Sequence, residues 1–116
     1  MNGLTTVWSV AVFVMAGLCE IGGGWLVWQA IRENKSRWWI APGAVALVAY
    51  GFVPATLLPD TSSTEFGRAF AVYGGIFIVM SLAWALLLDD FSPDLGDFLG
   101  ASIALLGVGI MWCYPR

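Results

Sequence analysis

Four apolar stretches, each about the length of a membrane-spanning helix, dominate this chain of 116 residues. They lie at residues 4–31, 38–59, 66–88 and 95–114, and short charged segments separate them. A helix needs about 20 mostly apolar residues to cross the hydrocarbon core of a bilayer. Because lipid offers no hydrogen bonds to the backbone, each spanning segment has to satisfy its own polar groups, as a helix does. The sequence therefore predicts an all-α membrane protein with a single four-helix transmembrane domain.

The composition excludes several other classes of protein. Charged residues make up only 11% of the chain, whereas about a quarter is usual in a soluble domain. This excludes a water-soluble domain, a disordered region and a basic nucleic-acid binder. The chain has no His, so imidazole metal sites and Ser-His or Cys-His catalytic pairs are excluded, and Cys19 and Cys113 form no CxxC motif. We therefore expect no enzyme activity, no metal and no cofactor.

The segments at the helix ends allow more specific predictions. The first span lacks a basic leading segment and carries a carboxylate, so we expect it to remain as a helix rather than to be a cleaved signal peptide. Residues 62–65 predict a capping box for the third helix. Ser92 is the predicted N-cap of the fourth helix, and Pro93 its first residue. We interpret the acidic third loop as solvated rather than as a calcium site, because it lacks the EF-hand spacing.

The basic residues of the loops give a weak signal for orientation. Four spans place both termini on the same side of the membrane. The first loop holds three basic residues, whereas the second loop and the C-terminus together hold two. They are Arg32, Lys35 and Arg37 on one side, and Arg68 and Arg116 on the other. So small a bias predicts either a weak preference for the first loop inside or insertion in both orientations; we favour dual insertion.

Glu20 is the residue that bears most on function. It lies near the middle of the first apolar stretch, and the uncharged runs hold no Lys, Arg or His to pair with it. An ionised carboxylate in that position costs several kcal/mol unless something compensates it. Protonation, an exogenous cation, or hydroxyl and indole donors can do so. Glu20 therefore either binds a proton and a positive ligand in turn, or is a protonated residue that only links helices.

Small and aromatic residues could complete a site around this carboxylate. Ala16, Gly17, Gly23 and Gly24 lie three or four residues from Glu20, so they share its helical face. Such a stripe permits close helix packing or borders a ligand cavity. Tyr73, Tyr50 and Trp28 are candidate lining residues, because an aromatic ring attracts a cation in a dry site. Each of them could instead face lipid or serve packing alone.

The fourth span has a different character. It has no ionisable side chain between Phe98 and Tyr114, and it presents small residues at near-heptad spacing. Gly100, Ala104 and Gly107 therefore predict a helix-association surface. Because four short helices enclose little space, a transport path needs two copies, and we expect a homodimer.

Several short stretches resemble one known family over nearly the whole chain. They are CEIGG at 19–23, WLVWQ at 25–29, WW at 38–39, PG at 42–43, GR at 67–68, YGG at 73–75, Asp97, LGA at 99–101, IAL at 103–105 and PR at 115–116. With these, the sequence resembles the YnfA family of small four-helix proteins of the bacterial inner membrane, which are related to the small multidrug resistance transporters.

The resemblance implies both a function and an assembly. In the wider multidrug group, the first-helix glutamate binds protons and cationic substrates alternately in an antiparallel, dual-topology homodimer, and Glu20 takes that role here. Tyr73 falls where those transporters have a substrate-contacting Trp, and Gly100 with Gly107 falls in their dimerising helix. We expect proton-coupled efflux of small lipophilic or guanidinium-like cations by alternating access. The alternative is a non-transporting assembly partner or helper subunit.

Overall fold

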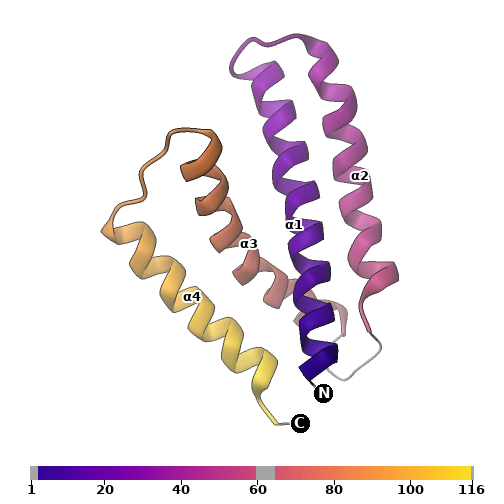
Figure 1. Cartoon of the computed structure of the whole chain (residues 1–116), viewed down its shortest axis with the longest axis vertical. Coiled ribbons are helices and arrows are strands. Elements are labelled where there is room, and N and C mark those ends of the chain that lie inside the picture. Colours follow the sequence, from indigo (N-terminus) through magenta and orange to yellow (C-terminus); the bar gives the residue numbers. More distant parts are fainter. Residues whose placement is uncertain (1–2, 60–64, 116) are drawn as a thin grey trace. The chain divides into compact units, whose positions relative to one another are not determined.

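Helices make up nearly all of the described structure (Figure 1). The computed structural model describes residues 3–59 and 65–115, and no strand occurs within them. The four α-helices are α1 (Gly3–Ile31), α2 (Ile40–Leu57), α3 (Phe66–Leu88) and α4 (Leu95–Cys113), and a short 3-10 helix, η1 (Arg37–Trp39), precedes α2. Each of the four is long and apolar enough to cross a membrane. The predicted all-α class and the four spans are confirmed.

The chain divides into two compact units between Leu58 and Pro59. The first unit contains α1 and α2, which run antiparallel side by side, and we call it the first hairpin (Figure 1). The second unit contains α3 and α4, and we call it the second hairpin. In both hairpins the longer helix comes first.

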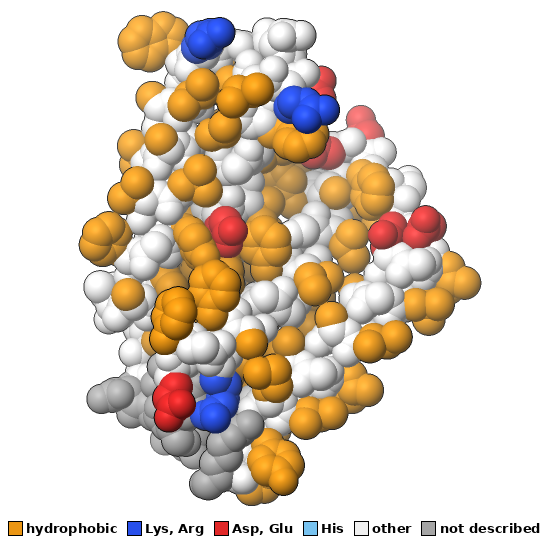
Figure 2. All heavy atoms as spheres, turned by 180° about the vertical axis from the view of Figure 1, so that it is seen from behind, with side chains coloured by type: hydrophobic (Ala, Val, Ile, Leu, Met, Phe, Trp, Pro, Cys, Tyr) orange, Lys and Arg blue, Asp and Glu red, His pale blue; other side chains and the backbone are white. Residues whose placement is uncertain are grey.

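The outer surface of both hairpins is apolar. Figure 2 shows hydrophobic side chains spread along the helices, with few charged side chains among them. Large side chains such as Leu4, Leu87 and Ile103 are exposed, and α4 has no buried residue at all. In helices of this length such a surface is suited to acyl chains rather than to water.

Hydroxyl groups within the helices are satisfied locally. Four of them donate to the carbonyl oxygen of the residue four positions earlier, over distances of 2.7 to 2.9 Å. They belong to Ser9, Thr56, Ser81 and Ser102. This arrangement lets a hydroxyl lie in a lipid-embedded helix without a partner on another helix.

The first helix of each hairpin ends in the same way. Asn34 after α1 and Asp90 after α3 have positive φ angles of 58° and 53°. The residue that follows each of them donates its N–H back to the helix, Lys35 to the Gln29 carbonyl at 3.0 Å and Phe91 to the Ala85 carbonyl at 3.1 Å. Asn and Asp tolerate the left-handed conformation better than other non-glycine residues. Each of the two helices therefore ends in a short turn that contains such a residue.

The predicted start of the fourth helix is wrong. The N-cap is Asp94 rather than Ser92, and α4 begins at Leu95 rather than at Pro93. The Asp94 carboxylate accepts the Asp97 N–H and the Asp97 carboxylate accepts the Asp94 N–H, each at 2.9 Å. This reciprocal pair satisfies two backbone donors and places negative charge at the positive end of the helix dipole. The capping box predicted for the third helix depends on residues 62–64, which lie outside the described residues.

The first hairpin is held together by a close crossing of two glycines. A Cβ atom built on Gly23 would lie 2.8 Å from the Gly43 carbonyl oxygen and 2.9 Å from the Leu47 side chain. A Cβ atom on Gly43 would lie 2.9 Å from the Gly23 carbonyl oxygen. The two backbones therefore approach each other more closely than any other residue type permits. Without a strong hydrophobic force between helices in lipid, such contact is a main source of association.

Two further contacts complete the packing of the hairpins. The Trp8 indole N–H donates to the Leu57 carbonyl oxygen at 2.6 Å, which links the start of α1 to the end of α2. This carbonyl has no N–H partner within its own helix because it belongs to the last turn. In the second hairpin, Gly75 packs so closely on Val108 that a Cβ atom there would overlap the valine side chain.

We predict that Gly23→Ala and Gly43→Ala each destabilise the first hairpin. The added methyl group has to displace backbone on the facing helix, and overpacking of this kind costs about 1–3 kcal/mol. The free energy of unfolding, measured by titrating sodium dodecyl sulfate into mixed micelles, should fall by that amount. Gly24→Ala is the matched control, since a Cβ atom at that position would meet no other atom within 4 Å. Equal effects of the substitutions at Gly23 and Gly24 would contradict the crossing.

Candidate functional site

Glu20 lies near the middle of α1, which extends from Gly3 to Ile31. Its side chain is half-buried. The only other acidic residue inside the four α-helices is Asp97, in the first turn of α4, and the only basic one is Arg68, in the first turn of α3. Glu20 is thus the one charged side chain that the sequence places far from a helix end.

The Tyr50 side chain of α2 meets this carboxylate, and its hydroxyl group donates a hydrogen bond to Glu20. The pairing follows from the register of the first hairpin. Gly23 lies against Gly43 and Leu47, and one turn back along α1 leads to Glu20 while one turn on along α2 leads to Tyr50. Two of the predicted site residues are therefore brought together, across the seam between α1 and α2.

The small residues around Glu20 separate into two flanks. At about 100° per residue, Gly23 and Ala16 lie to one side of Glu20, whereas Gly17 and Gly24 lie to the other. Gly23 faces α2, and Ala16 is fully buried. On the other flank Gly17 is buried, while Gly24 is exposed and has open space where a Cβ atom would lie. The carboxylate thus lies at the edge of the helix seam, and its flank at Gly24 is open.

Trp28 lies two turns from Glu20, at the loop end of α1. Its side chain is 52% exposed, and the guanidinium carbon of Arg32 is 5.0 Å from the centre of a ring of its indole. The nearest cation to this predicted site residue is therefore the chain's own Arg32. Close by, Trp25 and Trp39 have ring centroids 6.2 Å apart, and the Lys35 ammonium is 5.9 Å from the Trp39 ring.

Tyr73 belongs to the second hairpin. It is 5% exposed and lies between Phe70 and Phe77, with ring centroids 6.1 and 5.9 Å away. These three aromatic residues succeed one another at intervals of three and four along α3, so they stack on one face of the helix. The ring of Tyr73 is therefore packed between the rings of Phe70 and Phe77.

The predicted association surface lies along α4. Gly100 and Gly107 are exposed, and a Cβ atom built on either one would meet no other atom within 4 Å. Ala104 lies between them on the same helical face and is half-buried. The second hairpin therefore leaves the two glycines of this face open.

Within residues 3–59 and 65–115, no group of three or more His, Cys, Asp or Glu side chains is arranged to hold a metal ion. The acidic residues of the third loop lie near the start of α4, where Asp94 and Asp97 cap the helix. The groups that meet at the seam between α1 and α2 are one carboxyl group, of Glu20, and one phenol, of Tyr50.

Sequence reasoning missed two residues that shape this site. Gly43 and Leu47 of α2 pack against Gly23. This packing sets the register of the two helices that places Tyr50 next to Glu20. The glycine at position 43 of the second span was the available signal. It could not identify its partner, because the register of two antiparallel helices depends on contacts between them rather than on either sequence alone.

Four apolar helices and one carboxylate in the middle of a span define a small multi-pass membrane protein. The model of the family described as "Uncharacterised BCR, YnfA/UPF0060 family" matches residues 6–116. The chain belongs to this family, and the predicted family membership is confirmed.

Relatives that match include bacterial proteins named UPF0060 membrane protein. The chain is 53% identical to one from Nocardia farcinica over 113 residues, which is 97% of this chain and 98% of the relative. It is 50% identical to one from Kineococcus radiotolerans over 108 residues, covering 93% of this chain and 94% of the relative. No solved structure gives a significant match. The chain is thus a multi-pass membrane protein of a bacterial family, as predicted.

We predict that Glu20 and Tyr50 are energetically coupled. A double-mutant cycle with Glu20→Leu, Tyr50→Phe and the double variant should give a coupling energy of about 0.6–1.7 kcal/mol in the free energy of unfolding, the range of hydrogen bonds between membrane helices. Tyr114→Phe, just beyond α4, is the control and should show no coupling to Glu20. Additive effects of Glu20→Leu and Tyr50→Phe would contradict the hydrogen bond.

Proposed function

We propose that the protein exports small lipophilic or guanidinium-like cations in exchange for protons, as a homodimer that works by alternating access. The observation that carries this proposal is the carboxylate of Glu20 in the middle of α1, with the Tyr50 hydroxyl as a hydrogen-bond donor from α2. The resemblance to the small multidrug resistance transporters supports the same role for Glu20.

The chemistry of the pair explains how a proton and a cation exclude each other. A carboxylate has about four lone-pair sites, and a hydrogen bond from a phenol occupies one of them. Away from water, the ionised form is stable only when a positive charge lies close by, and the neutral form needs a proton. The site therefore binds either a cation or a proton. Loss of one allows binding of the other, which is what exchange requires.

The site favours organic cations over metal ions. A phenol hydroxyl is a weak metal ligand, and a single carboxylate supplies fewer oxygen atoms than the six to eight that calcium takes. A flat guanidinium group presents several N–H donors that match a carboxylate, and an aromatic ring adds attraction for a cation in a dry site. The aromatic ring of Tyr50 lies beside the carboxylate and can supply this attraction for the cation. The open flank at Gly24 leaves room for the ligand.

A second copy supplies the rest of the transport path. The open face of α4 at Gly100, Ala104 and Gly107 is suited to association with another such helix, because small residues allow backbones to approach. Two Glu20 side chains, one from each chain, would then face a common chamber. Insertion in both orientations would make that dimer antiparallel, and exchange of the two arrangements would open the chamber alternately to each side.

The test is transport by purified protein in liposomes with an imposed proton gradient. The wild type should move protons when guanidinium or a lipophilic quaternary ammonium ion is present on the other side. Glu20→Gln should reduce this flux to the background of protein-free liposomes, since the amide can neither release a proton nor pair with a cation. Cation binding by the wild type should weaken as the pH falls, and the variant should show no pH-dependent binding of the cation.

Glu33→Gln is the matched control, because it removes the same charge from the first loop and should leave the flux unchanged. Undiminished flux in Glu20→Gln would contradict the proposal. A cellular function that survives Glu20→Gln but requires a stoichiometric partner protein would instead support the helper-subunit alternative.

We further predict that bulky residues on the association face of α4 separate the dimer. Gly107→Leu or Gly100→Leu should convert the protein to monomers, as measured by the mass of the protein–detergent complex in light scattering. Gly109→Leu is the control, since Gly109 lies about 180° from Gly100 around the helix and is equally open. Loss of the dimer in the Gly109 variant alone would assign the interface to the opposite face.

A further inference from the structure

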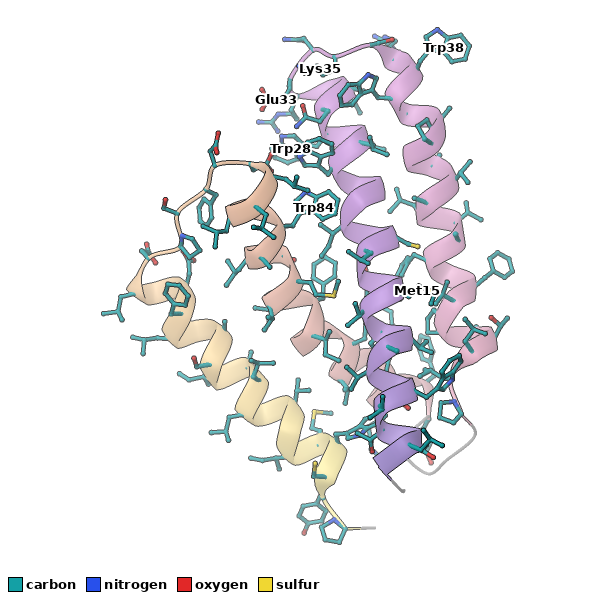
Figure 3. All side chains as sticks on the ribbon, in the orientation of Figure 1. Met15, Trp28, Glu33, Lys35, Trp38 and Trp84 are labelled. Atoms are coloured by element: carbon teal, nitrogen blue, oxygen red, sulfur yellow. The ribbon has the colours of Figure 1, made fainter. Side chains whose placement is uncertain are left out.

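The loop end of the first hairpin carries a basic and aromatic cluster that the transport proposal does not use. Residues 32–37 contain three basic side chains and one acidic side chain, all exposed: Arg32, Lys35, Arg37 and Glu33. In the described part of the chain, none of the three basic side chains forms an ion pair with a carboxylate. Figure 3 shows Trp28, Glu33, Lys35 and Trp38 at this end of the hairpin. The cluster therefore keeps an excess of positive charge for an outside partner.

Tryptophan rings orient two of these charges. Arg32 lies over Trp28 at 5.0 Å, and Lys35 lies over Trp39 at 5.9 Å. Trp39 in turn packs against Trp25, with the ring centroids 6.2 Å apart. A cation–π contact holds a side chain in place without neutralising its charge. Both groups thus remain able to donate hydrogen bonds to an anion.

The backbone of the loop is also ordered. Asn34 is in the left-handed conformation, and the Lys35 N–H donates to the Gln29 carbonyl at 3.0 Å. The Ser36 hydroxyl accepts the Trp38 N–H at 3.3 Å, which caps η1. These hydrogen bonds hold the backbone of the loop, so binding of an anion costs less backbone ordering entropy than in a flexible segment.

The exposed indole of Trp38 indicates how deep in the membrane this cluster lies. Its side chain is 83% exposed, at the point where the apolar α2 follows the charged loop. Indole rings prefer the interface between acyl chains and headgroups, and basic residues beside a membrane span attract anionic lipids. The cations of the cluster are then level with lipid phosphates.

We propose that Arg32 and Lys35 form a binding site for the phosphate of an anionic phospholipid headgroup, with Trp38 in contact with the same lipid at the acyl boundary. A guanidinium group has N–H donors in a planar fork that matches two phosphate oxygens, and the ammonium group supplies further donors. The opposite end of the first hairpin has no basic residue among its described positions, which are residues 3–8 and 55–59. Within the described part of the first hairpin, the basic charge is therefore confined to the loop end. The lipid site there does not depend on whether the protein transports cations.

The experiment measures lipid binding to the purified full-length protein in a neutral detergent by native mass spectrometry. Phosphatidylglycerol is compared with phosphatidylcholine, which has the same phosphate but no net charge. We expect the wild type to retain phosphatidylglycerol in preference to phosphatidylcholine. Removal of both charges by Arg32→Gln with Lys35→Gln should lower the affinity about fivefold for each charge, and so roughly 25-fold. Binding of phosphatidylcholine should stay the same.

Three controls make the result specific. Charge-preserving Arg32→Lys with Lys35→Arg should keep most of the binding, which separates the loss of charge from a change in fold. Glu33→Gln and Arg68→Gln should not weaken binding. Equal retention of both lipids by the wild type, or unchanged binding in the double Gln variant, would overturn the proposal. Displacement of phosphatidylglycerol by inorganic phosphate at similar concentrations would overturn the lipid assignment in favour of a free anion.

Discussion

A carboxylate in the middle of an apolar helix has to be compensated, and this constraint governs the first hairpin. Glu20 receives a hydrogen bond from Tyr50 of the neighbouring helix. A phenol compensates a carboxylate only in part, because it supplies a dipole rather than a charge. Full compensation needs a proton or a cation. The fold thus gives the carboxyl group a hydrogen-bond donor, and the proposed exchange of a proton for a cation would supply the rest of the compensation.

The support comes from the close crossing of α1 and α2. Gly23 and Gly43 permit backbone contact one turn from Glu20, and Trp8 links the two helices again at the far end through the Leu57 carbonyl. Hydroxyl groups elsewhere on the helices bond to their own backbones and take no part in this pairing. Glycine contact and one indole hydrogen bond therefore set the register in which Tyr50 reaches Glu20.

Hydropathy alone predicted the four helices well, because the length of an apolar run is dictated by the thickness of the bilayer. The observed helices fall within or next to the predicted spans. The start of α4 was predicted wrongly, since Ser92 and Asp94 are both good caps and only the reciprocal bond with Asp97 separates them. Glu20 and Tyr50 were both identified from the sequence as candidates. Their pairing was not, because it depends on the glycine crossing at Gly43.

The loop end of the first hairpin shows a similar limit of prediction from the sequence. The sequence identified Trp28 as a ring for a visiting cation, whereas the structure places the chain's own Arg32 over it. Contacts between residues four apart on a helix end were within reach of sequence reasoning. The contact of Lys35 with Trp39 was not, because it depends on the left-handed turn at Asn34.

The proposed function requires that one carboxyl group binds a proton and a cation in turn. The most direct measurement is the release of protons into a weakly buffered solution when guanidinium is added to the purified protein in detergent. We expect proton release that saturates together with cation binding in the wild type and is absent when position 20 carries an amide. Cation binding without proton release, or equal release from both proteins, would contradict it.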